Sequence, residues 1–302
     1  PAGQTFTLTT GVDSKVGGSG ADTFDGSTTS AGAQTLGTAD SLDGGAGVDT
    51  LSAAIASANT VTPTLKNIEN INLTFTAAGT LNLANSTGVT AVNLQASSAD
   101  AVVTNIASTA VALDVNGASG HSTFSLANAA LATTTDNVTD KLEGVQASGK
   151  DVIVQQGAGS DNTGAETLTI NSTTSANSVR SLNSFKQDGT TSAATKLVVT
   201  GDQPLTVANA LDVSYKTVDA SAATAAVTLN TANVNATVSG GSGADALTLS
   251  GGTGVVSVTA GAGNDTITFT GGSLSNTDTI NGGDGTDTLV ATSTELTGYT
   301  KP

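Results

Sequence analysis

Short alternations of apolar and small polar residues recur along the whole chain. Ile71–Thr76 (INLTFT), Val111–Val115 (VALDV) and Ile267–Thr270 (ITFT) each place apolar side chains at every second position. A period of two is typical of β-strands with one buried face. Clusters of Gly, Ser, Asn and Asp separate these runs, and helix-forming patterns are nearly absent. The pattern therefore predicts an all-β protein built from many short strands.

The spacing of the strand-like segments predicts how they are arranged. The segments Ile68–Phe75, Val89–Leu94 and Val111–Val115 begin about two dozen residues apart. Such self-similarity indicates a solenoid, in which each coil buries its apolar face against its neighbours. We predict three regions: an N-terminal block (1–52), a Thr/Ala/Asn-rich solenoid-like region (53–239) and a C-terminal block (240–302). Within the middle region, residues 133–195 are less regular and richer in charge, which fits either an inserted lobe or long surface loops.

A sharper repeat, a nonapeptide, occupies the two terminal blocks. Residues 17–25 (GGSGADTFD) and 44–52 (GGAGVDTLS) fit the template GGxGxDxUx, in which U is a large apolar residue. Residues 240–248 and 282–290 also fit, and residues 260–268 miss only the first Gly. Acidic residues keep the nonapeptide register at Asp13, Asp22, Asp40 and Asp49 and again at Asp278 and Asp287.

The chain has few charged residues, and most of them are acidic. Charged residues make up 11% of the sequence, yet the net charge is −16. No Lys or Arg occurs from Val16 to Leu65 or from Thr217 to Thr300, the stretches that contain the repeats. Nucleic-acid binding needs a basic surface that this composition lacks. No apolar run approaches the roughly 18 residues of a membrane-spanning helix, and the absence of Cys excludes disulfides and zinc–thiolate sites.

The residue types of the repeat match the chemistry of calcium. Ca²⁺ takes roughly six to eight oxygen ligands from carboxylates and backbone carbonyls, whereas Mg²⁺ demands a tighter octahedron and keeps its waters. Glycine permits the positive φ values that turn carbonyls inward, and an Asp at the sixth position reaches the ion from the turn itself. The predicted metal-binding residues are Asp13, Gly18, Gly20, Asp22, Asp40, Gly45, Gly47, Asp49, Gly241, Gly243, Asp245, Gly261, Gly263, Asp265, Asp278, Gly283, Gly285 and Asp287.

The nonapeptide register also predicts which turns share an ion. Two units make one coil, so turns on the same side of a roll lie two nonapeptides apart, as do Asp22 and Asp40. We therefore expect the turns of Asp22 and Asp40 to hold one ion between them. Asp161, in GAGSD, forms a partial metal turn, for which a solvated loop is the simpler interpretation.

The repeats resemble those of the RTX family, secreted calcium-binding proteins whose nonapeptides form a parallel β-roll. The resemblance covers the two blocks and implies several bound Ca²⁺ ions. The fold class that follows is an all-β, calcium-stabilised parallel β-roll or β-solenoid, with RTX blocks near both ends and an irregular strand-rich middle.

The sequence around the repeats is similar to RTX-bearing surface-layer (S-layer) proteins of Gram-negative bacteria, in segments such as LKNIENINLT and TKLVVTGDQPLTV. This resemblance implies a structural protein of the extracellular bacterial surface that self-associates into a two-dimensional lattice or filament. It also implies export by a type I system through a signal beyond Pro302, and contact with cell-surface polysaccharide through regions outside this chain. An RTX adhesin or biofilm-matrix filament module, and the non-catalytic tail of a secreted enzyme, are the alternatives.

Catalytic motifs are missing from the sequence. His121 is the only histidine, and neither HExxH nor GxSxG occurs. The Gly-rich turns carry Asp rather than the Lys-Ser/Thr pair of a phosphate-binding loop. We therefore expect a protein that is not an enzyme.

Overall fold

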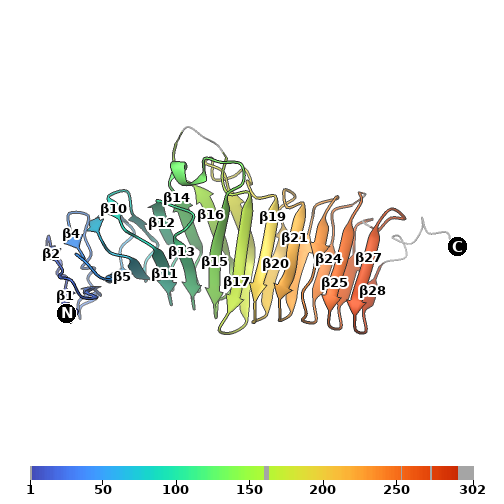
Figure 1. Cartoon of the computed structure of the whole chain (residues 1–302), viewed down its shortest axis with the longest axis horizontal. Helices are drawn as coiled ribbons and strands as arrows, with labels where there is room; N and C mark the ends of the chain where they lie inside the picture. Colours follow the sequence, from blue (N-terminus) through green and yellow to red (C-terminus); the bar gives the residue numbers. More distant parts are fainter. Residues whose placement is uncertain (1, 160–162, 253, 273, 292–302) are drawn as a thin grey trace.

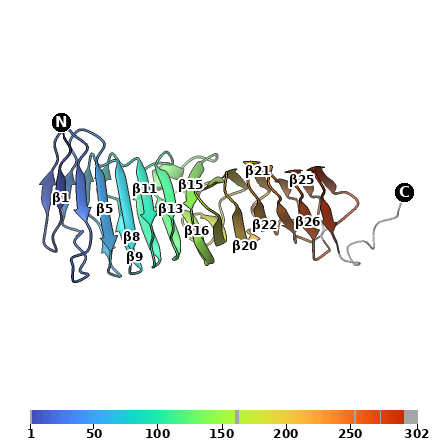
Figure 2. The ribbon, with the colours of Figure 1, turned by 90° about the horizontal axis from the view of Figure 1, so that it is seen from below.

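The period-two segments form short β-strands that wind into an elongated parallel solenoid. The computed structural model describes residues 2–159, 163–252, 254–272 and 274–291. Among these residues the single helical element is a 3₁₀ turn, η1 (Asn128–Leu131). The first and last strands lie at opposite ends of the long axis (Figures 1 and 2). The predicted fold class, a parallel β-solenoid, is confirmed.

The strands belong to three sheets, and all neighbouring strands within them are parallel. The 13-stranded sheet consists of β1 (Thr5–Thr7), β3 (Thr23–Gly26), β5 (Thr50–Ile55), β8 (Asn70–Phe75), β11 (Ala91–Gln95), β13 (Ala112–Asn116), β15 (Asn137–Glu143), β17 (Thr167–Thr173), β19 (Lys196–Gly201), β21 (Thr217–Ala223), β23 (Thr237–Ser239), β25 (Ser257–Ala262) and β27 (Thr279–Asp284). The 11-stranded sheet consists of β6 (Thr60–Val61), β9 (Gly79–Asn82), β12 (Ala101–Ile106), β14 (Ser122–Leu126), β16 (Gln146–Gln156), β18 (Asn177–Phe185), β20 (Leu205–Leu211), β22 (Val227–Thr231), β24 (Ala246–Leu249), β26 (Thr266–Phe269) and β28 (Thr288–Val290). The 4-stranded sheet consists of β2 (Ser14–Val16), β4 (Ser41–Asp43), β7 (Thr64–Lys66) and β10 (Ser86–Thr87).

Strand pairing sets the length of each coil. Asn70 pairs with Ala91, and Ala91 pairs with Ala112, so successive coils in this part of the solenoid are equally long. At the N-terminus, Thr5 pairs with Thr23, and Thr23 pairs with Thr50, which makes the second of these coils longer than the first by one nonapeptide. The coils of the N-terminal block therefore differ in length, although the block keeps its nonapeptide register.

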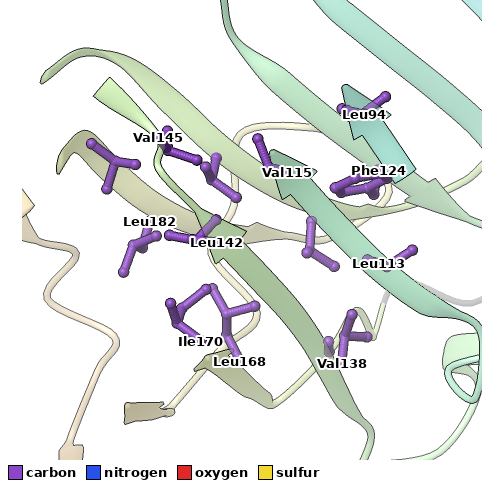
Figure 3. Packing of buried hydrophobic residues seen from close by; sticks show 14 of the residues in the cluster. Leu94, Leu113, Val115, Phe124, Val138, Leu142, Val145, Leu168, Ile170 and Leu182 are labelled. Carbon is purple, nitrogen blue, oxygen red and sulfur yellow. The ribbon is translucent and has the colours of Figure 1, made fainter. Parts of the chain in front are cut away.

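The core is a continuous column of apolar side chains inside the coils. Strands β5 and β8 alternate strictly between half-buried and buried positions, as a strand with one interior face must. Figure 3 shows Leu113 and Val115 of β13 and Leu142 of β15 among the side chains packed in this interior. Because each coil covers the apolar face of the next, the stack behaves as a nearly one-dimensional repeat structure.

Residues 133–195 contribute strands to the same two long sheets. Asn137 pairs with Thr167, and Thr167 pairs with Lys196, so both coils are longer than the one that follows from Lys196 to Thr217. The extra residues form excursions from the coil, which Figure 1 shows on one side near β14 and β16. The irregular segment is therefore a set of longer coils with surface excursions rather than a separate lobe. Asp161 lies outside the described residues.

Candidate metal centre

The glycine-rich turns stack on one another at the start of successive strands. In the N-terminal block, the turns 17–22 and 44–49 precede β3 and β5 of the 13-stranded sheet. In the C-terminal block, the turns 240–245, 260–265 and 282–287 precede β24, β26 and β28 of the 11-stranded sheet. Each block therefore presents its repeats as one pile of turns along one edge of a sheet.

Glycine is required in these turns because backbones meet directly between coils. A Cβ atom on Gly45 would lie 2.3 Å from the Gly18 carbonyl oxygen, and one on Gly261 would lie 2.0 Å from that of Gly241. The contacts are hydrogen-bonded, since the N–H groups of Ala46 and Ala262 donate to the same two carbonyls at 2.9 Å. A side chain at either glycine would force adjacent turns apart.

The Asp at the sixth position of each turn bridges to the preceding coil. Asp49 Oδ1 accepts the backbone N–H of Asp22 at 2.7 Å, and Asp22 Oδ1 accepts that of Gln4 at 2.6 Å. The C-terminal block repeats the arrangement: Asp265 Oδ1 accepts the N–H of Asp245 at 2.8 Å, and Asp287 Oδ1 accepts that of Asp265 at 3.0 Å. We call these two series, Gln4–Asp22–Asp49 and Asp245–Asp265–Asp287, the carboxylate columns.

The second carboxylate oxygen distinguishes two kinds of turn. In the first turn of each block, Asp22 Oδ2 accepts the Gly18 N–H at 2.6 Å and Asp245 Oδ2 accepts the Gly241 N–H at 2.7 Å. We call these turns closed. The next turn of each block contains Asp49 or Asp265, and both residues are almost fully buried. The Oδ2 atom of each has no hydrogen-bond partner. We call these turns open.

Backbone conformation explains the difference between closed and open turns. The second and fourth positions of the open turns have positive φ, which redirects their N–H groups. Gly45, for example, donates to Asp43 Oδ1 at 3.1 Å instead of to Asp49. The turn 282–287 shares this conformation. The positive-φ glycines of these three turns are Gly45 (88°), Gly47 (137°), Gly261 (111°), Gly263 (130°), Gly283 (95°) and Gly285 (135°).

A buried carboxylate oxygen without a donor is unfavourable unless a cation neutralises it. Burial raises the pKa of Asp245, opposed by the Gly241 and Val227 N–H groups, and the charge of Asp265 adds to the rise. Among the described residues no three His, Cys, Asp or Glu side chains gather around one point. Backbone carbonyls must therefore complete any ligand set, and a mixture of carboxylates and carbonyls is what Ca²⁺ accepts. The residues fit calcium, which Asp49 and Asp265 would hold through their unpaired Oδ2 atoms.

The predicted pairing of Asp22 with Asp40 is wrong. Asp22 stacks on Asp49, and Asp40 stacks on Asp13, whose N–H donates to Asp40 Oδ1 at 2.9 Å beside the 4-stranded sheet. The coil between Asp22 and Asp49 is one nonapeptide longer than a two-unit coil, because the segment that includes the buried Leu36 is inserted after β3. The acidic residues thus keep their nonapeptide spacing, but Asp22 stacks on Asp49 and not on Asp40.

The predicted metal-binding residues fall into two groups. The piles bring together Gly18, Gly20, Asp22, Gly45, Gly47 and Asp49 in one block and Gly241, Gly243, Asp245, Gly261, Gly263, Asp265, Gly283, Gly285 and Asp287 in the other. Asp13, Asp40 and Asp278 lie outside these piles. Both oxygens of Asp40 and of Asp278 accept backbone N–H groups, those of Asp13 and Gly37 and those of Val256 and Ser275.

Glu69 extends the N-terminal column and was not predicted from the sequence. Its Oε2 accepts the Asp49 N–H at 2.8 Å, the role that Asp plays elsewhere in the column. The interval between Asp49 and Glu69 is not a multiple of nine, and Glu69 lacks the glycines that mark the other turns. The signal that could have revealed it is the spacing between β5 and β8.

In the middle of the solenoid, basic side chains lie beside the acids. Arg180 Nε donates to Asp151 Oδ1 at 2.8 Å, and Lys150 Nζ lies 3.3 Å from Asp100 Oδ1. The Arg180 guanidinium lowers the pKa of Asp151, against the opposing effect of burial. His121 accepts the Asp151 N–H through Nδ1 at 3.1 Å, and this hydrogen bond links two adjacent coils.

Comparison with protein families supports the calcium chemistry of the turns. Residues 35–54, 239–273 and 275–293 match the model of the RTX calcium-binding nonapeptide repeat, in four copies. These stretches include the open turn at 44–49 and the whole C-terminal pile, whereas residues 17–25 lie outside them. No curated protein matches the chain. The described part of the chain contains no helix long and apolar enough to span a membrane.

The chain therefore carries RTX calcium-binding repeats near both ends of a parallel β-solenoid. Such repeats are typical of secreted proteins.

Proposed function

We propose that this chain is a calcium-dependent structural protein of the bacterial cell surface, assembled into an S-layer-type lattice. The observation that carries the proposal is the presence of stacked calcium-type turns near both ends of one continuous solenoid. Such an arrangement makes the order of both ends conditional on the ion. The proposal assigns no catalytic activity and places the protein outside the cell after export by a type I system.

The mechanism runs from charge to folding. At the low calcium concentration of the cytosol, the acidic residues of the stretches without Lys or Arg repel one another, and the unpaired oxygens of Asp49 and Asp265 oppose stacking. Outside the cell, calcium binds the folded turns and not the unfolded chain, so it stabilises them by linkage. Folding of the blocks would then create the surfaces through which copies of the chain assemble.

The experiment is assembly of the purified chain across a calcium titration, followed by circular dichroism, calorimetry and electron microscopy. The proposal predicts an increase in β-structure and thermal stability with calcium, and ordered sheets at millimolar calcium. A chain equally folded and equally heat-resistant in excess chelator contradicts the calcium dependence. Soluble monomers at every calcium concentration contradict the lattice and favour the adhesin or enzyme-tail alternatives.

A further inference from the structure

A single row of polar side chains crosses the outer face of the 13-stranded sheet. Strand register aligns one outward-facing residue from each of six consecutive strands, β5, β8, β11, β13, β15 and β17, and Figure 1 shows the last four of these strands in order along the solenoid. At about 4.8 Å between strands, five steps make a row about 24 Å long. We call it the polar row; its members are Ser52, Asn72, Asn93, Asp114, Lys141 and Asn171.

Two hollows lie on this row. The first, of about 610 Å³, contains Ser52 and Asn72 and is bounded by the loop after β3, at Ser27–Gly32. The second, of about 520 Å³, contains the other four members and is bounded by Thr109–Val111, just before β13. The Asn93 Nδ2 group donates to Asn72 Oδ1 at 2.8 Å and so joins the floors of the two hollows. The two hollows therefore follow one another along the solenoid axis, and we call them together the groove.

The lining of the groove combines hydrogen-bonding side chains with small or aliphatic residues such as Ala53 and Val111. The residues that form both hollows, all of them described, include hydroxyl and amide side chains and no aromatic ring. Within the described part of the chain, the side chains of Ser52, Thr74 and Asn171 have no hydrogen-bond partner, and the Asn72–Asn93 pair leaves the Asn72 Nδ2 group and the Asn93 Oδ1 atom unused.

The charge of the lining also restricts the occupant. Asp114 and Lys141 are the charged residues of the two linings and lie 3.6 Å apart, and Lys141 also pairs with Glu143, so the groove has no excess of positive charge. A polyanion would lack basic partners, and an apolar helix or lipid would leave the amides and hydroxyls buried without partners. A hydroxyl group is both donor and acceptor, and therefore matches an unused amide pair.

We propose that this groove binds a linear, neutral polysaccharide chain lying along the solenoid axis. Binding depends on hydrogen bonds from the polar row rather than on stacking, so each copy of the protein binds weakly. A lattice or filament of such copies would hold the polymer through many weak sites. The site belongs to this chain and does not depend on the calcium-driven lattice.

The test is affinity electrophoresis of the full chain in calcium, in native gels that contain dextran, a β-1,4-mannan or a β-1,3-glucan as the probe. Asn171→Ala removes a half-buried, outward-facing amide of the groove without breaking any hydrogen bond of its side chain. Asn183→Ala is the matched control, because Asn183 is likewise half-buried and outward-facing, but lies in β18 of the other long sheet. Melting temperatures of both variants verify that the fold is retained.

The proposal predicts retardation of the parent chain by at least one of the three polymers. Asn171→Ala should weaken that binding by about three- to tenfold, the effect of one hydrogen bond, and Asn93→Ala combined with Asn171→Ala by more. Asn183→Ala should bind as the parent does. Retardation by none of the polymers, or equal retardation of all variants, overturns the proposal. Self-association that the groove variants abolish overturns it as well, because the occupant would then be a second copy of the chain. Lattice formation is scored separately, so either proposal can fail alone.

Discussion

The ends and the middle of this solenoid neutralise their stacked acids in different ways. In the carboxylate columns of the terminal blocks, the carboxylates accept backbone N–H groups, and Asp49 and Asp265 each keep one buried oxygen without a donor. In the middle, Lys150, Arg180 and Lys196 each form an ion pair with an acid from another coil. Side chains supply the positive charge in the middle coils, and on the proposal made above a bound calcium ion supplies it in the terminal columns.

The difference teaches how a repeat fold can be made conditional. A cation that belongs to a side chain is always present, so we expect the middle coils to be stable whatever the calcium concentration. A calcium ion binds only where its concentration is sufficient, so we expect the terminal coils to fold only when calcium is available. Removing an acid of the carboxylate columns should therefore affect the terminal blocks alone. Removing a basic side chain of the middle coils should affect the middle alone.

The largest effect is expected from Asp265→Ala. Asp265 is the central member of the C-terminal column: its carboxylate accepts the Asp245 N–H, and its own N–H donates to Asp287. The variant should lose the calcium-dependent stabilisation of this site, about 3 kcal/mol when calcium is 100-fold above its Kd. Calorimetric unfolding across a calcium titration measures the loss. The control is Asp202→Ala, which removes an exposed acid outside the columns, and an unchanged calcium dependence of Asp265→Ala would contradict the role of the column.

The middle region should respond to the loss of a base. Arg180→Ala leaves Asp151, a buried acid, without its guanidinium partner. A drop of a few degrees in melting temperature is expected, equal in calcium and in chelator. Lys186→Ala serves as the control, since Lys186 forms no ion pair with any described residue. A drop that appears only in chelator would show that the two regions are not independent.

A smaller effect with a defined pH dependence is expected from Asp140→Asn. Asp140 faces the interior between Leu113 and Ile170, and both its carboxylate oxygens lack hydrogen-bond partners. Burial, with the nearby charge of Asp114, raises the pKa of Asp140 well above its usual value. The folded state thus retains a proton that the unfolded chain releases above about pH 4.

The sign of the Asp140 effect follows from linkage. The parent should lose stability as pH rises above about 4, because the unfolded chain then binds fewer protons than the folded one. Asp140→Asn removes this slope and should be more stable than the parent at pH 7, by about 1 kcal/mol or more. Urea unfolding of both proteins from pH 4 to 8 provides the comparison, and parallel profiles would contradict a buried, protonated Asp140.

The smallest effect is expected at the boundary between the regions. Lys66 Nζ lies 2.8 Å from Asp43 Oδ2 and is well exposed, and it lowers the pKa of Asp43. Lys66→Ala should reduce stability by less than about 1 kcal/mol, as for other surface ion pairs. A lowered pKa contributes stability above the unfolded value, so the small difference should vanish as the solution is acidified below about pH 4. A larger loss would mean that the region stabilised by basic side chains already begins in the N-terminal block.

The fold could be predicted from the sequence because its signals are local. Alternation at Ile71–Thr76 identifies a strand with one buried face, and strands at a near-constant spacing identify a solenoid. What could not be predicted is which coils align. The step from Thr23 to Thr50 depends on the burial of Leu36 inside the coil, a packing event that leaves no periodic signal.

The candidate site divides in the same way. The glycine-rich turns could be located from the sequence, because their conformation is a property of the residue types, and the assignment of their Gly and Asp residues as metal ligands stays a prediction. The pairing of Asp22 was wrong and Glu69 was missed, since both depend on how coils of unequal length align. The distinction between open and closed turns was not predicted, because closed turns contain the same glycines.

Hydrogen exchange resolved along the chain, in calcium and in chelator, tests the central claim most directly. The account predicts that chelation removes the protection of amides in the terminal turns and strands, including those of Asp22 and Asp265. Amides of the middle strands β14 to β19 should keep their protection in both conditions. Equal protection of the terminal blocks with and without calcium, or collapse of the middle together with the ends, would contradict it.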